Sequence, residues 1–279
     1  MTFNNLIAGE WVGGNATENR NPSDTNDVVG LYTQGTPDDM RAAIAAAKAA
    51  FPAWSRSGIV ERHAILQKTS DEILARKEEL GTLLAREEGK TLPKAIGKTI
   101  RASQIFDFFA GECLRLAGES LPSVRPGVGV EITREPIGPI GLITPWNFPI
   151  AIPAWKIAPA LCYGNTVVLK PADETPLSAL KLAELVLEAG YPAGVFNVVT
   201  GTGAVAGDAL TRHPGVDKLT FTGSTAVGQQ IGRVAMDNMT RVTLELGGKS
   251  PTIVMADADL SVAAAGAAQA IFFNQGQVC

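Results

Sequence analysis

The sequence contains few of the residues that build metal sites and disulfides. Its three cysteines, Cys113, Cys162 and Cys279, are dispersed, and there are only two histidines among 279 residues. A structural zinc site needs four such ligands at close spacing, so none is expected and no metal is predicted. Sparse cysteines that stay reduced are typical of the cytoplasm, which is the predicted location.

Long hydrophobic runs and blocks of one charge are missing as well. The longest apolar stretch, 136–161, is interrupted by prolines and contains Lys156, so it is not expected to be a membrane helix. The opening residues MTFNNLIAGEW carry no basic region ahead of an apolar core, so no signal peptide is expected. A net charge of −4 with scattered basic residues predicts no nucleic-acid or membrane partner.

The first half of the chain is expected to be mainly helical. Thr36 is a suitable cap for a helix that begins at Pro37 and ends at Pro52. Apolar residues at helical spacing predict an amphipathic helix or helix pair over 59–88, and a further helix is expected over 93–116.

The pattern changes at residues 119–136. Val128, Val130 and Ile132 alternate with other side chains, among them Glu131, and turn residues precede them. This arrangement predicts a hairpin with one face in water.

From residue 137 onward, strand and helix patterns alternate. Apolar β-type runs occupy 140–143, 166–169, 195–199, 218–222 and 241–244. Helical segments separate them at 149–161, 176–189, 203–212 and 226–236. Strands buried on both faces and joined by helices predict an α/β fold with a doubly wound, Rossmann-type parallel sheet. Such sheets commonly bind a dinucleotide at the carboxyl ends of their strands.

Polar residues follow three of these strands. The Asn147 amide, in the segment TPWNFP, can point at a developing oxyanion or satisfy local backbone groups. Lys170 suits the hydroxyls or phosphates of a nucleotide, although a lysine beside an acidic helix start is also common. Gly223 and Ser224 open a helix and can present N–H groups to a pyrophosphate or form an ordinary cap.

Glu245 and Cys279 complete the set of candidates. Glu245 follows an apolar strand and precedes two glycines, an apolar setting that would suit a general base, whereas the alternative is an ion pair with Lys249. Cys279 follows an alanine-rich helix and an amide-rich turn, and a free cysteine is either a nucleophile or a small buried hydrophobe.

The order and spacing of these motifs resemble the aldehyde dehydrogenase superfamily over essentially the whole chain. The shared motifs are IAGEW, TPWNFP, VLKPADETP, FTGSTAVG, ELGGKSP and FNQGQVC. The last two resemble the family's active-site signatures, and Glu245 and Cys279 lie 34 positions apart (279 − 245), as in the family. Within the family, PWNFPIAIPAWKIAPAL and KPADETP resemble bacterial α-ketoglutaric semialdehyde (2,5-dioxopentanoate) dehydrogenases, with succinic and glutaric semialdehydes as neighbouring substrates.

The resemblance implies a covalent mechanism. Cys279 would attack the aldehyde carbon, and the Asn147 amide and the Cys279 N–H would bind the oxyanion of the thiohemiacetal. Hydride would pass to NAD or NADP, and Glu245 would activate the water that hydrolyses the thioester.

The resemblance also implies the cofactor contacts. Lys170 would bind the adenosine ribose, Ser224 and Trp146 would lie near the pyrophosphate, and Gly207 would lie near the adenine. Asp173 stands where members that prefer NAD usually have Glu, and the shorter side chain leaves room for a 2′-phosphate, so the choice between NAD and NADP stays open. The predicted cofactor-binding residues are Pro145, Trp146, Lys170, Asp173, Gly207, Gly223, Ser224, Thr225 and Gly228.

The family's architecture divides the sequence into a NAD(P)-binding domain (1–117 and 137–247), an oligomerisation hairpin (118–136) and the truncated start of an α/β catalytic domain (248–279). The last part is expected to contain a strand near 252–255 and a helix near 259–272, and a homodimer or homotetramer is the family's usual assembly. Because family members continue well past Cys279, a protein that ended there is expected to be an inactive, cofactor-binding fragment. A coenzyme A-acylating dehydrogenase is the other alternative, but that branch generally lacks a base at the position of Glu245.

Overall fold

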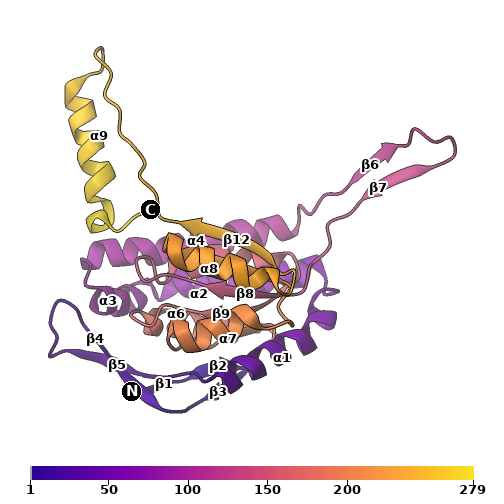
Figure 1. The fold of residues 1–279 in the computed structure, drawn as a ribbon, viewed down its shortest axis with the longest axis horizontal. Coiled ribbons are helices and arrows are strands. Elements are labelled where there is room, and N and C mark those ends of the chain that lie inside the picture. Colours follow the sequence, from indigo (N-terminus) through magenta and orange to yellow (C-terminus); the bar gives the residue numbers. More distant parts are fainter. Residues whose placement is uncertain (1) are drawn as a thin grey trace.

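A seven-stranded sheet lies at the centre of the protein in the computed structural model, which describes residues 2–279 (Figure 1). Its strand order is β12-β11-β8-β9-β10-β2-β3, and the neighbours from β12 to β10 are parallel. These five strands are β8 (Pro139–Ile143), β9 (Thr166–Lys170), β10 (Phe196–Val198), β11 (Lys218–Gly223) and β12 (Arg241–Leu246). They coincide with the five predicted apolar runs, and the predicted doubly wound parallel sheet is confirmed.

Helices cover both faces of this sheet. On one face lie α5 (Ala151–Cys162) and α6 (Pro176–Ala189), backed by α2 (Ile59–Ala75), α3 (Lys77–Glu88) and α4 (Leu92–Cys113). On the other face lie α1 (Pro37–Trp54), η1 (Gly203–Gly207), α7 (Asp208–Arg212) and α8 (Thr225–Met236). Each face has its own cluster of buried apolar side chains. The segment 59–88 is therefore a helix pair, and the other predicted helical segments also form helices.

The amino-terminal residues extend and flank the sheet. The strands β2 (Asn5–Ile7) and β3 (Glu10–Val12) join its edge beside β10 in antiparallel orientation. A separate three-stranded sheet contains β1 (Thr2–Phe3), β4 (Ala16–Arg20) and β5 (Val28–Thr33). Side chains from β4 and β5 donate hydrogen bonds to the loop that follows β9.

The first long helix begins as predicted but ends later. The Thr36 hydroxyl accepts a bond from the Asp39 N–H at 3.1 Å, and the Asp39 carboxylate accepts one from the Thr36 N–H at 2.8 Å. Pro52 lies inside the helix, so the prediction that it ends the helix was wrong. The missing N–H of Pro52 costs only one bond in the last turn, and buried Trp54, whose ring lies 5.7 Å from that of Tyr191, anchors the continuation.

The strands β11 and β12 differ from the central strands in burial. Every residue of β8, β9 and β10 is buried, whereas only alternate residues of β11 are. Leu219 and Phe221 pack on the α8 side, while Thr220 and Thr222 on the other face are partly exposed. The prediction that all five strands are buried on both faces was therefore wrong for β11 and β12. The alternation of apolar and polar residues in β11 was the signal for one wet face.

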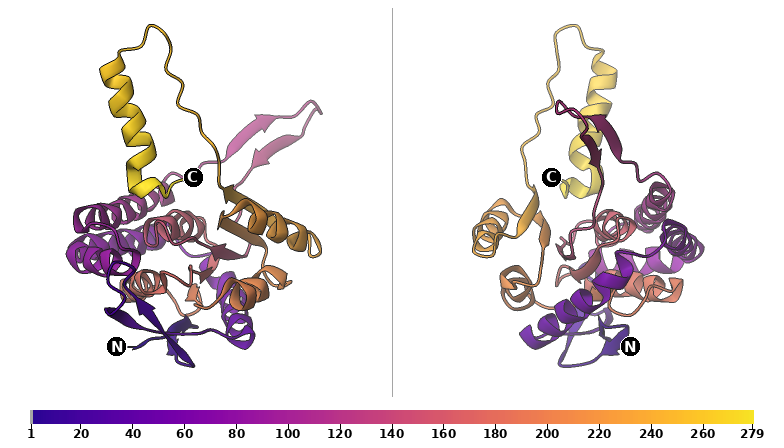
Figure 2. Two further views of the ribbon diagram at one scale, coloured as in Figure 1. Left: turned by 60° about the vertical axis from the view of Figure 1, so that its left-hand side comes forward. Right: turned by 90° about the vertical axis from the view of Figure 1, so that its right-hand side faces the viewer.

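Two segments project from the body of the protein (Figures 1 and 2). One is the hairpin of β6 (Glu119–Pro122) and β7 (Gly129–Ile132), and every residue of both strands is exposed. The prediction that only one face of the hairpin is wet was wrong, because no other part of the described chain covers the second face. In contrast to the parallel strands of the central sheet, the hairpin has no apolar layer among residues 2–279 against which to pack.

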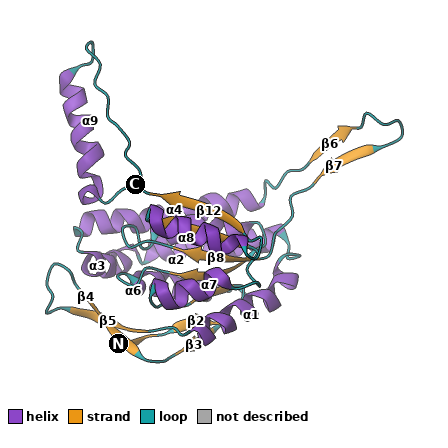
Figure 3. Cartoon of the chain, in the orientation of Figure 1, coloured by secondary structure: helices purple, strands orange, loops and turns teal. Residues whose placement is uncertain are grey.

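The second projecting segment is 247–279, which leaves the end of β12, runs outward and returns through α9 (Leu260–Phe272) (Figure 3). The expected helix is present, but none of its residues is buried. The expected strand near 252–255 is absent, because a strand needs a partner for its backbone groups and none lies beside it. Within residues 2–279, no helix combines the length and apolar character needed to cross a membrane.

Candidate active site

The parallel arrangement brings the carboxyl ends of four strands to one edge of the sheet. Ile143 of β8 pairs with Lys170 of β9 and with Phe221 of β11, and Thr222 of β11 pairs with Glu245 of β12. Residues that are far apart in the sequence therefore leave the sheet at neighbouring points. This edge is where the candidate residues were expected.

A hollow of about 240 Å³ at this edge gathers many of the predicted residues. Its lining includes Pro145, Trp146, Asn147, Gly223, Ser224, Glu245 and Cys279. All three predicted catalytic residues therefore share one hollow with four of the predicted cofactor-binding residues. Their chemical roles stay predictions, but the sequence order alone did not require this proximity.

Cys279 reaches the hollow because the outer segment returns to the sheet. The Gly248 N–H, just after β12, donates to the Cys279 carbonyl oxygen at 2.8 Å, which closes the excursion of residues 247–279. Cys279 is exposed, whereas Cys113 and Cys162 are buried. Cys279 is therefore the one accessible thiol among the described residues.

The Asn147 side chain connects the loop after β8 to the loop that carries Cys279. Its Nδ2 donates to the Gln277 carbonyl oxygen at 2.6 Å, and its Oδ1 is buried without a hydrogen-bond partner. A carboxamide nitrogen has two hydrogens, so one donor remains after this bond. The amide is thus positioned two residues from Cys279 and keeps a donor for an oxyanion.

Glu245 lies on the open face of β12. The strand places Val242, Leu244 and Leu246 toward the apolar cluster under α8, so Glu245 projects to the opposite side and is exposed. The expected apolar setting was wrong, because neighbours in the sequence of a strand point to opposite faces. A solvent-accessible carboxylate can still receive a proton from water in the hollow.

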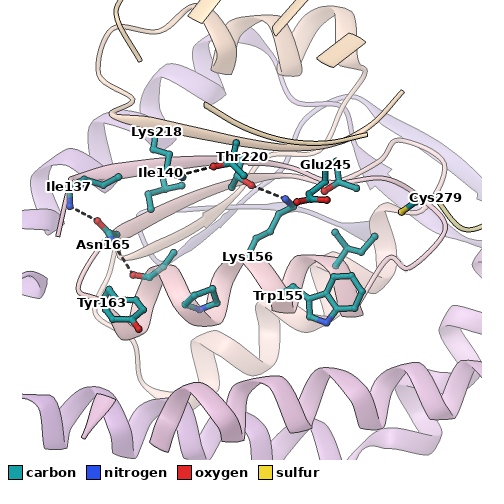
Figure 4. Close-up of a pocket in the computed structure, with 15 residues that line it drawn as sticks. Ile137, Ile140, Trp155, Lys156, Tyr163, Asn165, Lys218, Thr220, Glu245 and Cys279 are labelled. Atoms are coloured by element: carbon teal, nitrogen blue, oxygen red, sulfur yellow. Dashed lines mark hydrogen bonds between the residues drawn. The ribbon is translucent and has the colours of Figure 1, made fainter. Parts of the chain in front are cut away.

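Lys156 is a site residue that the sequence reasoning did not identify. Its Nζ donates to the Thr220 hydroxyl at 2.7 Å, and it lies close enough to Glu245 for an electrostatic interaction (Figure 4). Burial lowers the pKa of Lys156 to about 8, and the negative charge of Glu245 opposes this shift. A single lysine within an otherwise apolar helix was the available signal.

Glu245 and Cys279 also border a second and larger hollow, of about 580 Å³ (Figure 4). This hollow lies between α5 and the open face of β11 and β12, and Ile152, Trp155 and Lys156 contribute to its wall. The two residues therefore stand between two spaces. One space faces the predicted cofactor residues, and the other has a mainly apolar wall suited to an organic substrate.

The amino terminus of α8 opens beside the smaller hollow. The Ser224 hydroxyl accepts a weak hydrogen bond from the Val227 N–H at 3.4 Å, so Ser224 is the cap of the helix. Thr225 is the first residue of the helix, and both Ser224 and Thr225 are exposed. The free N–H groups of such a terminus favour an anion. A Cβ at Gly223 would lie 2.5 Å from the Phe221 ring, and one at Gly228 would lie 2.4 Å from Leu246. These two glycines therefore allow close packing, and Gly223 also lines the smaller hollow. Their predicted contact with the cofactor stays a prediction.

A third hollow, of about 400 Å³, separates η1 and α7 from α8. Gly207 lines it, together with Ile143 and with Val227 and Ile231 of α8. No atom lies within 4 Å of the position of a Cβ at Gly207, so the space over this residue is open. An apolar slot of this kind next to the start of α8 fits a flat heterocyclic ring.

Lys170 is the last residue of β9, and Asp173 lies in the loop that follows this strand. The Lys170 ammonium group is buried and lies 3.5 Å from the Asp173 carboxylate, and burial lowers the pKa of Lys170. The Tyr32 hydroxyl of β5 donates to the Asp173 carbonyl oxygen at 3.0 Å, and the Asn19 amide of β4 donates to that of Glu174 at 2.8 Å. The small amino-terminal sheet thus holds this loop in place.

The carboxyl end of α3 supports the same region and was also not identified from the sequence. Buried Glu87 accepts bonds from the N–H groups of Leu177 at 2.6 Å and Ser178 at 2.8 Å, which caps α6. Burial raises the pKa of Glu87 to about 7, although both amide bonds act in the opposite direction. A carboxylate that caps a helix 90 residues away leaves no local pattern in the sequence.

Known proteins are similar in sequence to this chain over almost its whole length. The chain is 46% identical to an α-ketoglutaric semialdehyde dehydrogenase of Bacillus subtilis, with 100% of this chain and 58% of that protein aligned. It is also 46% identical to a phenylacetaldehyde dehydrogenase of Pseudomonas fluorescens, with 98% and 57% aligned. The chain thus spans a little over half the length of these relatives.

Solved structures agree in fold as well as in sequence. An aldehyde dehydrogenase of Bacillus cereus in complex with NAD⁺ matches with a TM-score of 0.97 and 39% identity, over 100% of this chain and 58% of that one. An NADP-dependent enzyme of Escherichia coli matches with a TM-score of 0.97 and 42% identity, over the same shares. The profile of the aldehyde dehydrogenase family matches residues 11–279, and this chain belongs to that family.

Proposed function

We propose that the protein oxidises an aldehyde to a carboxylic acid with NAD or NADP, and that Cys279, Glu245 and Asn147 carry the chemistry. The observation behind this proposal is the single hollow that these three residues share. A nucleophile, an oxyanion donor and a base at one point are the groups that acyl transfer through a thioester requires. The relatives' names support the reaction class.

The cofactor fits the described residues at two places. The open slot over Gly207 accepts a flat base, and the capped amino terminus of α8 at Ser224 accepts a negatively charged group. When bound, the nicotinamide supplies the acceptor for the hydride that leaves the substrate carbon. The protein's part is to hold the cofactor beside Cys279 and to handle the protons.

The residues of the chain then act in sequence. The Cys279 thiolate adds to the aldehyde carbon, and the spare hydrogen of the Asn147 amide binds the oxygen that becomes negative. Loss of hydride leaves a thioester on Cys279. Glu245 takes a proton from a water molecule while the water oxygen attacks the thioester carbon. The C–S bond then breaks, the carboxylic acid and the Cys279 thiolate are released, and Glu245 passes its proton to solvent.

The sharpest test separates the two halves of the reaction. Glu245→Gln should retain a rapid burst of about one reduced cofactor per site, because acylation does not need the base, while steady turnover falls by roughly 10²-fold. Cys279→Ser should lose both the burst and the turnover. A protein that binds the cofactor but shows no burst with any aldehyde would instead be a cofactor-binding module.

Transfer to coenzyme A is the competing fate of the thioester. We favour hydrolysis because Glu245 is present and borders the same hollow as Cys279. Coenzyme A should therefore leave the rate of cofactor reduction unchanged. An increase in rate on its addition would show that the thioester passes to a thiol rather than to water.

For the substrate we propose α-ketoglutaric semialdehyde, on the strength of the similarity to the Bacillus subtilis enzyme. The equal identity to a phenylacetaldehyde dehydrogenase defines the comparison that decides it. The specificity constant for the semialdehyde should exceed that for phenylacetaldehyde by about 10²-fold, a difference of roughly 3 kcal/mol. The opposite ratio would assign an arylaldehyde instead.

We also propose that the protein is a homodimer or homotetramer assembled through the β6–β7 hairpin. Leu121, Val128, Val130 and Ile132 are all exposed on this hairpin, whose outer edges are unpaired among the described residues. An unpaired edge with apolar side chains is a site for strand addition. Light scattering during size exclusion should give a multiple of the chain mass, and Val130→Lys should shift it toward the monomer.

A further inference from the structure

A buried lysine lies behind the candidate site, in the turn between α3 and α4. Lys90 is 4% exposed, and its Nζ lies 2.7 Å from the Glu88 carboxylate. A lysine ammonium group has three donors and is rarely buried unless acceptors surround it. The two other acceptors around Lys90 come from two of the segments that supply the lining of the smaller hollow, the one of about 240 Å³.

The first of these segments is the loop after β8. Lys90 Nζ donates to the Asn147 carbonyl oxygen at 3.3 Å, so it holds the main chain of the residue whose amide is proposed to bind the oxyanion. The second segment is the turn before Cys279. Lys90 Nζ donates to the Asn274 Oδ1 at 2.8 Å, and the Asn274 side chain is fully enclosed.

Asn274 continues this network toward Cys279. Its Nδ2 donates to the Asn147 carbonyl oxygen at 3.1 Å and approaches the Gln277 carbonyl oxygen at 3.4 Å. The Gln277 oxygen is also the acceptor for the Asn147 amide. Lys90 and Asn274 therefore join the same two segments that the Asn147 amide joins.

The turn that Lys90 holds has an unfavourable backbone conformation. Asn274, Gln275 and Gly276 have φ angles of +50°, +57° and +76°, so three consecutive residues are left-handed. Such a conformation costs about 1 kcal/mol or more for each residue that is not glycine, and it persists only where its surroundings fix it. The hydrogen bond from Lys90 to the enclosed Asn274 side chain is one of the contacts that fix this turn, together with the bonds that Asn274 and Asn147 make.

A second cation supports the same two segments. The Lys98 ammonium group lies 3.8 Å from the Phe148 ring centre and 4.5 Å from that of Phe273. Phe148 follows Asn147, and Phe273 precedes Asn274. The face of α3 and α4 toward the site is thus built to hold the two loops in register.

We propose that Lys90 is a positioning residue for the dehydrogenase reaction. Its ammonium group fixes the turn over residues 273–279 (the Cys279 turn) against the loop after β8 that contains Asn147 (the Asn147 loop), so that the nucleophile and the oxyanion donor face the same substrate carbon atom. This inference rests on the proposed function for its effect on rate. Lys90 has no contact with the reacting atoms and acts through Asn274 and the Asn147 main chain. Glu88 compensates the buried charge.

The first test is Lys90→Met in the protein at its natural length. Loss of the tether should lower kcat by about 50-fold while KM for the aldehyde and Kd for the cofactor change less than threefold, because binding surfaces are kept and alignment is lost. The matched control is Lys181→Met, which removes a partly buried lysine that pairs with Glu79 and Glu184 at 2.9 Å, away from the hollow. This control should leave kcat unchanged.

A readout without turnover keeps the inference separate from the proposed function. In hydrogen exchange followed by mass spectrometry, the peptide over residues 273–279 should exchange at least tenfold faster in Lys90→Met than in the wild type or in Lys181→Met. If the wild type oxidises no aldehyde, the proposed function fails, but this measurement still tests the tether. Unchanged exchange in that peptide would overturn the positioning role.

A second variant covers the case in which Lys90→Met does not fold. Asn274→Gly keeps the Lys90–Glu88 pair and suits the positive φ angle, but it removes the link between Lys90 and the turn. It should lower kcat by about tenfold on its own. Where Lys90→Met folds, the double variant should be about as slow as Lys90→Met alone, because both substitutions break one connection. Additive effects, or wild-type kcat in Asn274→Gly, would refute the proposal.

Discussion

Helices α6 and α9 are both mostly apolar, yet ten residues of α6 are buried and none of α9 is. The helix α6 lies between the central sheet and the layer of α2 and α3, and Glu87 caps its amino terminus. The helix α9 belongs to a segment whose described contacts with the body lie near its two ends. An apolar helix is therefore buried only where a second layer of helices, such as α2 and α3, covers it. The turn before Cys279 has no such layer over it, and hydrogen bonds hold it in place instead.

This division predicts that the two regions respond differently to substitution, and the largest effect is expected at the end of the outer segment. Cys279→Ser should lower aldehyde oxidation by at least about 10³-fold, because a hydroxyl ionises much less readily than a thiol and is a far weaker nucleophile. The free energy of unfolding should change by less than about 0.5 kcal/mol because Cys279 is exposed. Cofactor reduction and urea unfolding measure the two quantities, and a large loss of stability would break the division.

Removing one apolar side chain from each helix tests the same difference directly. Leu180→Ala in α6, where the side chain is 1% exposed, should lower the free energy of unfolding by about 3 kcal/mol. Leu260→Ala in α9, where it is 73% exposed, should cost less than about 0.5 kcal/mol. Urea unfolding of the two variants checks both values. Equal losses would mean that something covers α9 in the purified protein.

The cap of α6 should make the stability of the body depend on pH. Burial raises the pKa of Glu87 from 4.5 to about 7 in the folded protein, so the folded state binds this proton more tightly than the unfolded state. The stabilisation is full below pH 4.5 and is lost as the pH rises through 7, at up to about 1 kcal/mol per pH unit. Urea unfolding between pH 4.5 and 7 should show this slope.

The matched pair of variants for this slope is Glu87→Gln and Glu61→Gln. The first removes the titrating group at the α6 cap and should flatten the slope, although Glu88, whose pKa burial also raises to about 7, contributes to the remainder. The second removes an exposed carboxylate of α2 and should leave the slope as it was. If the slope of the free energy of unfolding against pH is the same in Glu87→Gln as in the wild type, a group other than Glu87 causes it.

The smallest expected effect concerns the loop that the amino-terminal sheet holds. Asp173 is partly exposed beside Lys170, and we propose that its short carboxylate leaves space for a 2′-phosphate. Asp173→Glu should raise the ratio of catalytic efficiencies for NAD over NADP by about tenfold, which corresponds to roughly 1.4 kcal/mol. A wild-type protein that already favours NAD strongly would contradict the idea that Asp173 relaxes the choice.

The sequence predicted the sheet and most helices because their signals are local. The spacing of apolar residues indicates a strand or a helix within a window of about ten residues. The motif around Cys279 likewise indicates a nucleophile from a few neighbouring residues. The apolar setting of Glu245 was predicted wrongly because local composition does not say which face of a strand is covered. The expected strand near 252–255 failed for a related reason, since a strand exists only with a partner.

Lys90 could not have been predicted in the same way. Its acceptors lie 57 and 184 residues further along the chain, and no periodicity relates positions at such separations. A lysine after a glycine in a turn is expected to be exposed, and only the folded structure shows the carboxylate and carbonyl oxygens around it. Lys156 could be predicted in part. A single charge within an apolar helix can be seen in the sequence, whereas its hydrogen-bond partner, Thr220, cannot.

The neighbouring carboxylates Glu87 and Glu88 at the end of α3 also limit where residues can be inserted into the chain. Glu87 holds the start of α6, beside the Asp173 loop, and Glu88 pairs with Lys90, which holds the Cys279 turn. One inserted residue in the last turn of α3 would rotate this helix end by about 100° and remove both connections together. Insertions should therefore be tolerated at the tip of the β6–β7 hairpin, where no such connection exists among the described residues, but not in α3.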